Sequence, residues 1–178
     1  MKIQQVILVN ENDEQTGTIE KIEAHEKALL HRAFSIFIFN NKGEMLLQQR
    51  AIKKYHSGGL WSNACCSHPE PGEETLDAAQ RRLQEEAGFT TNLEKIFDFI
   101  YKVDFENGLT EYELDHVFIG KYDGNIDFNK KEAMDYCYKR MGDISHSLQT
   151  HPQKYTAWFL IAFPRIEKWW NEHFNNRS

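Results

Sequence analysis

The chain has 178 residues, of which 40% are hydrophobic, and its formal net charge is −6. This length and apolar content predict one globular domain covering residues 1–178. The negative charge argues against a general nucleic-acid binder and against a protein that binds anionic membranes. The N-terminus lacks a signal-peptide pattern, and the longest apolar run, residues 155–163, is too short to cross a bilayer. Three cysteines, two of them adjacent, favour a reducing, cytoplasmic setting.

Alternating and continuous apolar runs predict a chain rich in strands. Strands are expected at residues 2–10, 34–39, 44–50, 96–103, 111–122 and 133–140. The runs at 34–39 and 44–50 form a hairpin, because Asn-Lys-Gly between them supplies turn chemistry. Turns or loops are expected at 10–17, 51–74 and 105–108, where Gly, Pro, Asn and Asp gather.

Two helices are expected. The first covers 75–88, with Thr75 as its cap, Asp77 in its first turn and Gly88 at its C-terminal end. Its apolar stripe is formed by Leu76, Ala79, Leu83 and Ala87. The second is aromatic, covers 155–174, and is expected to bend or break at Pro164. Because strands outnumber helices and mix with them irregularly, an α+β fold with a mixed central β-sheet flanked by helices is predicted.

The charged side of the first helix carries Arg82, Glu85 and Glu86, and alone it would indicate a solvated face with an Arg82–Glu86 ion pair. The frame around it resembles the Nudix signature, in which a loop glutamate precedes an Arg-Glu-rich helix. Six residues fall in register with that signature: Glu73, Arg81, Leu83, Glu85, Glu86 and Gly88.

Two positions depart from the signature. Ser67 stands where the opening glycine would be, and Arg82 stands where a metal-binding glutamate would be. Nudix hydrolases gather divalent cations on a diphosphate with their helix carboxylates and activate water there. Arg82 removes one anionic ligand and adds donors suited to phosphate oxygens. The helix therefore favours diphosphate binding with impaired metal-assisted hydrolysis.

Three histidines and two glutamates form a candidate metal set. His25 and His31 precede the first hairpin strand, and His68 lies two residues after Cys66. Glu111 and Glu113 are two residues apart in a strand, so their side chains share one face. Taken singly, such residues are ordinary surface or core groups. Taken together, they suit a divalent ion such as Mn, Mg, Fe or Zn.

Several motifs together resemble type I isopentenyl-diphosphate isomerase. They are WSNACCSHPEPGE at 61–73, AH at 24–25, LHRAFS at 30–35, YELDHVF at 112–118 and the altered Nudix helix. The resemblance runs along nearly the whole chain. It implies a Nudix-like α+β fold and an isomerase of cytoplasmic isoprenoid biosynthesis that interconverts isopentenyl and dimethylallyl diphosphate.

The resemblance also implies roles for individual residues. One divalent metal (Mn, Mg or Zn) would be held by His25, His31, His68, Glu111 and Glu113. Cys66 and Glu113 would transfer protons on opposite faces of the substrate through a tertiary carbocation, with Tyr101 beside Glu113 and Trp158 facing the reacting carbons. The diphosphate would be bound by Lys21, Arg50, Lys54 and Arg82, with Mg held by Glu86.

Two alternatives stay open on the residues alone. A Nudix hydrolase of nucleoside or other diphosphates would release phosphate or a mononucleotide, and Arg82 counts against it. A catalytically silent module that binds a diphosphate or a protein would tolerate Cys66→Ala. Trp158 could equally be a core anchor, and residues 50–54 an exposed basic turn, whereas Cys65 and Cys137 are expected to pack as small hydrophobes. The sequence leaves open the native metal, the direction of proton transfer, the oligomeric state and whether the C-terminal helix is a lid.

Overall fold

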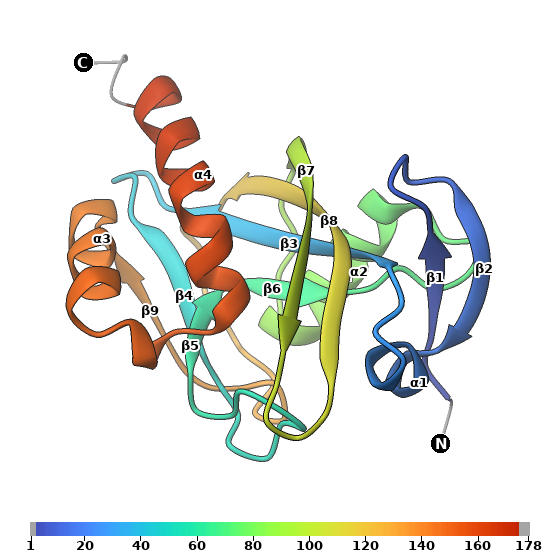
Figure 1. Cartoon of the computed structure of the whole chain (residues 1–178). Helices are drawn as coiled ribbons and strands as arrows, with labels where there is room; N and C mark the ends of the chain where they lie inside the picture. The colour runs from blue at the N-terminus through green and yellow to red at the C-terminus, as the bar shows by residue number, and fades with distance from the viewer. Residues whose placement is uncertain (1–2, 175–178) are drawn as a thin grey trace.

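One mixed β-sheet runs through the molecule, and helices lie on both of its faces (Figure 1). The computed structural model describes residues 3–174. The strands of that part are β1 Gln5–Val9, β2 Gln15–Glu20, β3 His31–Phe39, β4 Met45–Arg50, β5 Trp61–Asn63, β6 Cys65–Ser67, β7 Leu93–Asp104, β8 Thr110–Lys121 and β9 Ala133–Lys139. Its helices are α1 Lys21–Glu26, α2 Thr75–Ala87, α3 Met141–Thr150 and α4 Ala157–His173, with a 3₁₀ turn, η1, at Pro152–Lys154. No helix within this part is long and apolar enough to cross a membrane.

Strand β3 is the centre of the sheet. It pairs antiparallel with β1, β4 and β6, and parallel with β8 over residues 31–39 and 113–121. Every residue of β3 except Arg32 is buried, as expected for a strand covered on both faces. The parallel register sets His31 directly opposite Glu113, while β6 brings Cys66 opposite Ser35 on the other edge of β3. These two pairings bring residues from distant parts of the chain into one site.

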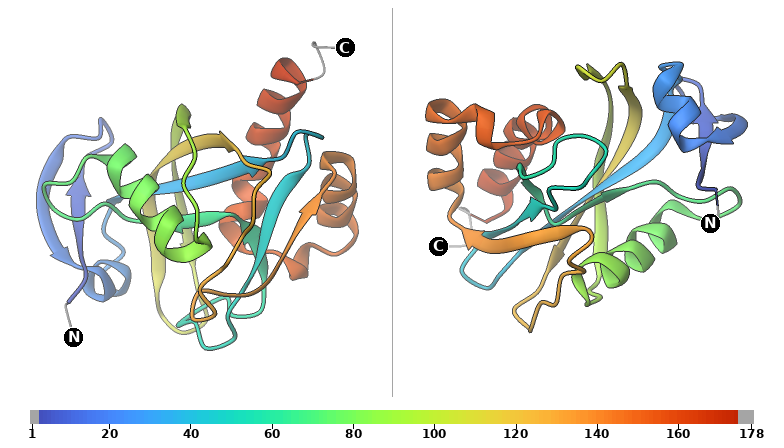
Figure 2. Two further views of the ribbon diagram at one scale, coloured as in Figure 1. Left: turned by 180° about the vertical axis from the view of Figure 1, so that it is seen from behind. Right: turned by 90° about the horizontal axis from the view of Figure 1, so that it is seen from below.

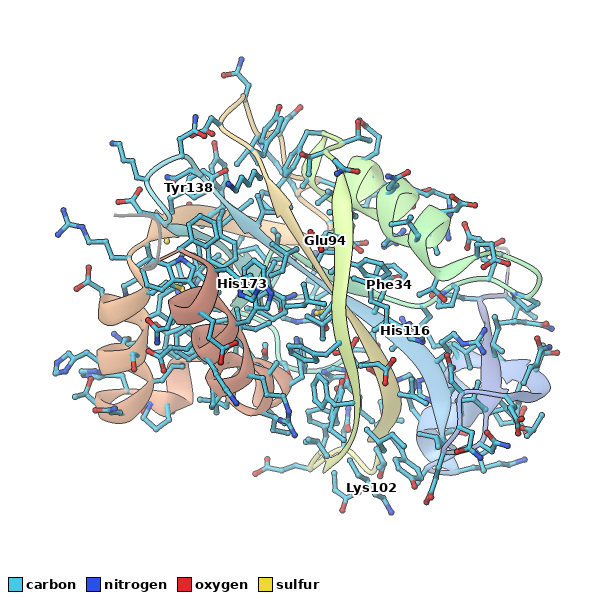
Figure 3. The ribbon with its side chains drawn as sticks, turned by 90° about the horizontal axis from the view of Figure 1, so that it is seen from above. Phe34, Glu94, Lys102, His116, Tyr138 and His173 are labelled. Carbon is cyan, nitrogen blue, oxygen red and sulfur yellow. The ribbon has the colours of Figure 1, made fainter. Side chains whose placement is uncertain are left out.

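The two faces of the sheet have separate apolar cores. Helix α2 packs Leu83 against a cluster that includes Phe34 and Ala64, whereas α4 packs Phe159 against a cluster that includes Phe37. Seen from behind and from below, α2 lies on one side of the sheet and α3 and α4 on the other (Figure 2). The view from above shows Phe34 near α2 and His173 on α4 (Figure 3). The helices thus anchor the sheet from both sides.

The predicted fold class is confirmed, and all six predicted strands exist with shifted ends. The first prediction began at residue 2, which lies outside the described residues. The loop expected at 51–74 was wrong in part, because it contains β5 and β6. These strands have three residues each, too few for a periodic pattern, and they form only because β3 and β4 offer edges to them. Strand β2 and helix α1 were also missed, since their polar sequences resemble turns.

Helix α2 matches its prediction in extent, and Gly88 ends it in the left-handed conformation with φ +76°. The predicted cap was wrong, because Thr75 is already helical and Glu74 occupies the N-cap position without a capping side-chain bond. Leu76 does not belong to the buried stripe, since it is 41% exposed. Glu86 faces the interior instead, with 4% exposure. A carboxylate buried at that place marks a polar cavity under the helix.

The C-terminal region differs from its prediction in two ways. Of the bend or break expected at Pro164, the break is wrong, because helix α4 continues through Pro164 to His173. Pro164 is exposed, so that water can bond the carbonyl that its missing N–H leaves free. Helix α3, at Met141–Thr150, was not predicted. It buries little apolar surface of its own, chiefly Met141 and Ile144, so its apolar pattern is faint.

Candidate active site

Three histidines and one glutamate converge in the interior. His25 comes from α1, His31 from β3, His68 from the segment after β6, and Glu113 from β8. Their ligand atoms lie within 4.8 Å of one another. From Glu113 Oε1, the Nε2 atoms lie at 2.9 Å (His68), 3.4 Å (His31) and 4.0 Å (His25). Ligands about 2.0–2.2 Å from a tetrahedral ion lie about 3.3 Å apart, so these spacings bracket those of a metal site.

The histidine rings are oriented for metal binding. Nδ1 of His25 lies 2.6 Å from the carbonyl of Lys21, and Nδ1 of His31 lies 2.8 Å from that of Leu29. A carbonyl only accepts, so each Nδ1 carries the hydrogen and each Nε2 presents a lone pair to the cluster. Nε2 of His25 is buried without a hydrogen-bond partner in the described part of the chain. A cation among these four groups would satisfy that nitrogen.

The electrostatics of the cluster agree with a ligand set. Burial lowers the pKa of His68 to about 3, so its ring is neutral, as a metal ligand must be. Burial by itself would raise the pKa of Glu113, but His68 and His31 outweigh it and hold that pKa well below its ordinary value. Burial also lowers the pKa of His25, whereas Glu113 outweighs burial and raises the pKa of His31. A buried carboxylate beside imidazole nitrogens is a ligand set that suits a divalent ion such as Mn, Mg or Zn.

Glu111 stands beside the cluster and outside it. Tyr101 Oη lies 2.7 Å from Glu113 Oε2 and 3.0 Å from Glu111 Oε2, so the phenol bridges the two carboxylates. The shared strand face predicted for these glutamates is confirmed, since both line one cavity. The other oxygen of Glu111 lies 3.2 Å from Nε2 of His56, a residue to which no sequence motif drew attention.

Cys66 is held in a network of polar groups. Its Sγ lies 3.2 Å from Asn63 Oδ1 and 3.3 Å from Ser35 Oγ. Asn63 donates its amide hydrogens to the carbonyls of Ile36 and Cys65, which turns its oxygen toward the sulfur. Burial raises the pKa of the Cys66 thiol well above its ordinary value, and the charge of nearby Asp115 adds to the effect. Cys66 is therefore a neutral thiol.

The hydroxyl of Ser35 is itself bound to Asp115, at 2.6 Å. Burial raises the pKa of Asp115 well above its ordinary value, and Glu113 contributes to that shift. Sequence reasoning missed Ser35, Asn63 and Asp115. A signal existed for all three: Ser35 ends the motif at 30–35, Asn63 belongs to the cysteine motif, and Asp115 follows Glu113 by two residues on the same strand face.

One cavity unites the predicted site residues. His25 and His31 lie behind its wall at 0% exposure. The predicted residues that line it are Lys21, Arg50, Lys54, Cys66, His68, Arg82, Glu86, Tyr101, Glu111, Glu113 and Trp158. The segments that supply them range from α1 to α4, so the sheet and both covering layers build the site.

The cationic end of the cavity is tied together by ion pairs. Arg82 binds Glu86 and lies 3.8 Å from Glu132, and Lys54 also binds Glu132. Burial raises the pKa of Glu86, against the opposing charge of Arg82. Burial lowers the pKa of Lys21, and the charge of Lys54 lowers it further. Crowded cations with partly satisfied charge suit a dianionic ligand.

Trp158 lies where α4 meets β5. Its Nε1 donates to Ser62 Oγ at 2.9 Å, and the side chain is 4% exposed. The guanidinium of Arg50 lies 4.9 Å from the centre of its ring. Trp158 is thus both an anchor of the helix and a wall of the cavity.

The loop before α2 is fixed by a bidentate ion pair. Arg81 donates Nε to Glu73 Oε1 at 2.7 Å and Nη2 to Glu73 Oε2 at 2.8 Å. The pair closes the Pro/Gly loop onto the helix. It keeps Arg82, the next residue, directed at the cavity.

The chain belongs to the NUDIX domain family, whose model matches residues 29–159. A structure from Deinococcus radiodurans has the same fold, with a TM-score of 0.76 at 17% identity over 91% of this chain and 98% of that one. A MutT protein from Methanosarcina mazei has a TM-score of 0.62 at 22% identity, covering 84% of this chain and 96% of that one.

Among sequence relatives, the isopentenyl-diphosphate Delta-isomerase of Pectobacterium atrosepticum is 48% identical over 100% of this chain and 99% of its own length. That of Serratia proteamaculans is 43% identical over 92% of this chain and 94% of its own length. The chain therefore belongs to the isopentenyl-diphosphate Delta-isomerase family, a branch of the NUDIX fold.

Proposed function

We propose that the protein interconverts isopentenyl and dimethylallyl diphosphate by adding one proton and removing another through a tertiary carbocation. Cys66 and Glu113 are the two proton-transfer groups. The observation that carries the proposal is that the Cys66 thiol and the Glu113 carboxylate line one cavity, although they come from strands on different edges of β3. The names of the relatives supply the substrate pair.

The chemistry needs two groups because the substrate has no acidic proton. A new C–H bond forms at the terminal methylene carbon, and the double-bond electrons leave a cation on the neighbouring tertiary carbon. A C–H bond then breaks on the far side of that carbon, and its electrons form the new double bond. A neutral thiol and an ionised carboxylate form a matched donor and acceptor on opposite faces of the substrate.

The surrounding residues protect the intermediate. Tyr101 hydrogen-bonds Glu113 and fixes its carboxylate. Trp158 offers a ring that stabilises a cation by about 0.5–2 kcal/mol. Burial excludes water, which would otherwise capture the carbocation.

The metal would be held by His25, His31, His68, Glu113 and, as a further oxygen ligand, Glu111. A bound divalent ion supplies positive charge that lowers the basicity of Glu113 and fixes its position. A second ion, Mg, would be held by Glu86 together with the substrate diphosphate.

The diphosphate is the handle by which the substrate is bound. It is met at the cationic end of the cavity by Lys21, Arg50, Lys54 and Arg82. Arg82 favours this function over hydrolysis, because it stands where a hydrolase would carry another metal-binding glutamate.

The test is deuterium incorporation. Purified protein with Mg and isopentenyl diphosphate in heavy water is expected to form the deuterated dimethylallyl isomer without releasing phosphate. Cys66→Ala and Glu113→Gln are each expected to lose at least about 10²–10⁴-fold of the rate, the usual contribution of an acid or base. Cys137→Ala, on β9 and away from the cavity lining, is the matched cysteine control. Retained exchange in Cys66→Ala, or released phosphate as the main product, would overturn the assignment.

A further inference from the structure

We propose that His56 is a positioning residue that holds the Glu111 carboxylate at the edge of the histidine–glutamate cluster, where it acts as an additional oxygen ligand. This inference rests on the metal site of the proposed function. It adds a residue that lies outside the ligand set and outside every motif of the sequence.

The contacts of the Glu111 carboxylate support this role. One oxygen faces the hydroxyl of Tyr101 at 3.0 Å, and the other lies 3.2 Å from Nε2 of His56. His56 and Glu111 are 8% and 6% exposed, so water contributes little to either. Tyr101 donates to one oxygen and the His56 ring stands at the other, so the carboxylate is held between two side chains.

The ring of His56 is aimed at Glu111 by its second nitrogen. Nδ1 lies 3.2 Å from the hydroxyl of Ser57, which can donate to it and leave the hydrogen on Nε2. That Nε2 is buried, and within the described residues it has no well-aligned hydrogen-bond partner. A buried polar nitrogen without an aligned partner is costly. The nearest carboxylate oxygen to this nitrogen is Glu111 Oε1, at 3.2 Å.

The loop that carries His56 is held in an unusual backbone conformation. Ser57 has a φ of +54°, in the left-handed region, and Gly59 follows with +80°. A Cβ on Gly58 would lie 2.3 Å from the carbonyl oxygen of Ile52. Glycine adopts a positive φ freely, but at Ser57 it costs about 1–3 kcal/mol and persists where the surroundings fix it. The strained turn directs His56 inward.

Aromatic neighbours fix the ring plane. It stacks on Phe105 of the β7–β8 turn, with centroids 4.3 Å apart and planes at 14°, and meets Trp158 edge-on at 5.7 Å. Asn107 of the same turn donates to the carbonyl of Tyr55 at 3.1 Å. The ring is therefore held between the β7–β8 turn and Trp158 of the cavity wall.

Two substitutions separate the ring from its hydrogen-bond donor. His56→Phe keeps the stacking on Phe105 and removes Nε2. His56→Gln loses the ring but can place an amide N–H where Nε2 stood. A residue that only forms a wall would be replaced well by Phe and badly by Gln, whereas a positioning donor shows the reverse order.

The experiment measures Mn²⁺ binding to metal-free protein without substrate, from the electron paramagnetic resonance signal of free Mn²⁺. Partners of metal ligands usually contribute about 10–100-fold to metal affinity. His56→Phe is therefore expected to raise the Kd by that factor, and His56→Gln to stay within about threefold of the unchanged protein. His146→Phe, on the exposed side of α3, is the matched control and is expected to bind normally. Thermal unfolding verifies that each variant is folded.

The outcomes separate this inference from the proposed function. A folded His56→Phe variant with unchanged Mn²⁺ affinity overturns the role of His56 and leaves the isomerase proposal intact. A Gln variant as weak as the Phe variant also overturns it, because the donor would then not be the cause. If the unchanged protein binds no Mn²⁺, the metal site and the role of His56 fail together, and deuterium exchange still reports separately on isomerisation.

Discussion

Arg82 makes a buried carboxylate tolerable, and its removal gives a quantitative test of the site. The side chain of Glu86 is 6% exposed and bound to Arg82, whose own side chain is 22% exposed. Breaking a buried pair on one side costs about 3–5 kcal/mol. Because Arg82 is partly solvated, and because Glu86 can take up a proton, Arg82→Met is expected to lower the free energy of unfolding by about 2–3 kcal/mol.

The assay is a double-mutant cycle followed by urea unfolding. Arg82→Met, Glu86→Gln and the double variant isolate the coupling between the two side chains. Removing both charges is expected to cost less than removing Arg82 alone, since no carboxylate is then left unpaired. Arg140→Met, at an exposed arginine, is the control for the same chemical change.

The loss of stability caused by Arg82→Met is predicted to depend on pH. Burial already raises the pKa of Glu86 while Arg82 opposes the rise, so the pKa rises further without Arg82. The folded state then binds the proton more tightly than the unfolded state. Stability falls as pH increases from the ordinary value of 4.5 toward the raised one. The cost of Arg82→Met is therefore larger at pH 8 than at pH 5. A coupling below about 0.5 kcal/mol, or an equal deficit at both pH values, would refute this reasoning.

Three further outcomes are expected. Mn²⁺ at 100 times its Kd should stabilise the metal-free protein by about 2.7 kcal/mol, about 5–11 °C in Tm for this size; an equal shift in His31→Ala would show that the ion binds elsewhere. Trp158→Leu should lower kcat for isomer formation about 2–30-fold through loss of the ring face, and an unchanged kcat would leave Trp158 as an anchor only. Gly88→Ala should lower the free energy of unfolding by at least about 1–2 kcal/mol, because φ is +76° and the new Cβ would lie 2.8 Å from the Asp127 carbonyl oxygen. The control is Gly142→Ala, whose Cβ would have nothing within 4 Å, and equal costs for the two variants would contradict the argument.

The parts of the fold that sequence reasoning found are those with a long apolar period. Strands β3 and β8 are buried along nearly their whole length, so their sequences contain long apolar runs that predict strands. The short strands β5 and β6 have no such signal and exist because neighbouring edges pair with them. The capping error at Thr75 arose because residue type was considered without the backbone, which places Glu74 at the N-cap.

The site residues also fall into those that a sequence motif identifies and those that only the fold reveals. Motif residues such as Cys66 and Glu113 were identified by resemblance, and the fold brings them to one cavity. His56 was not identified, because a single histidine in a Gly-rich loop has no pattern that points inward. Its position depends on the left-handed turn at Ser57 and on the ring of Phe105, from a turn about 50 residues away in sequence. Contacts between residues so far apart in the chain cannot be predicted from a local sequence pattern.

The parallel pairing of β3 with β8 also affects how the chain folds during its synthesis. Its paired residues are about 80 positions apart, a separation that slows folding. On a translating ribosome, His25 and His31 emerge long before Glu113, and Trp158 follows Glu113 by about 45 residues, roughly 2–9 s at ordinary synthesis rates. A nascent chain can therefore bring His25, His31, His68 and Glu113 together while Trp158, part of the cavity wall, is still to be synthesised.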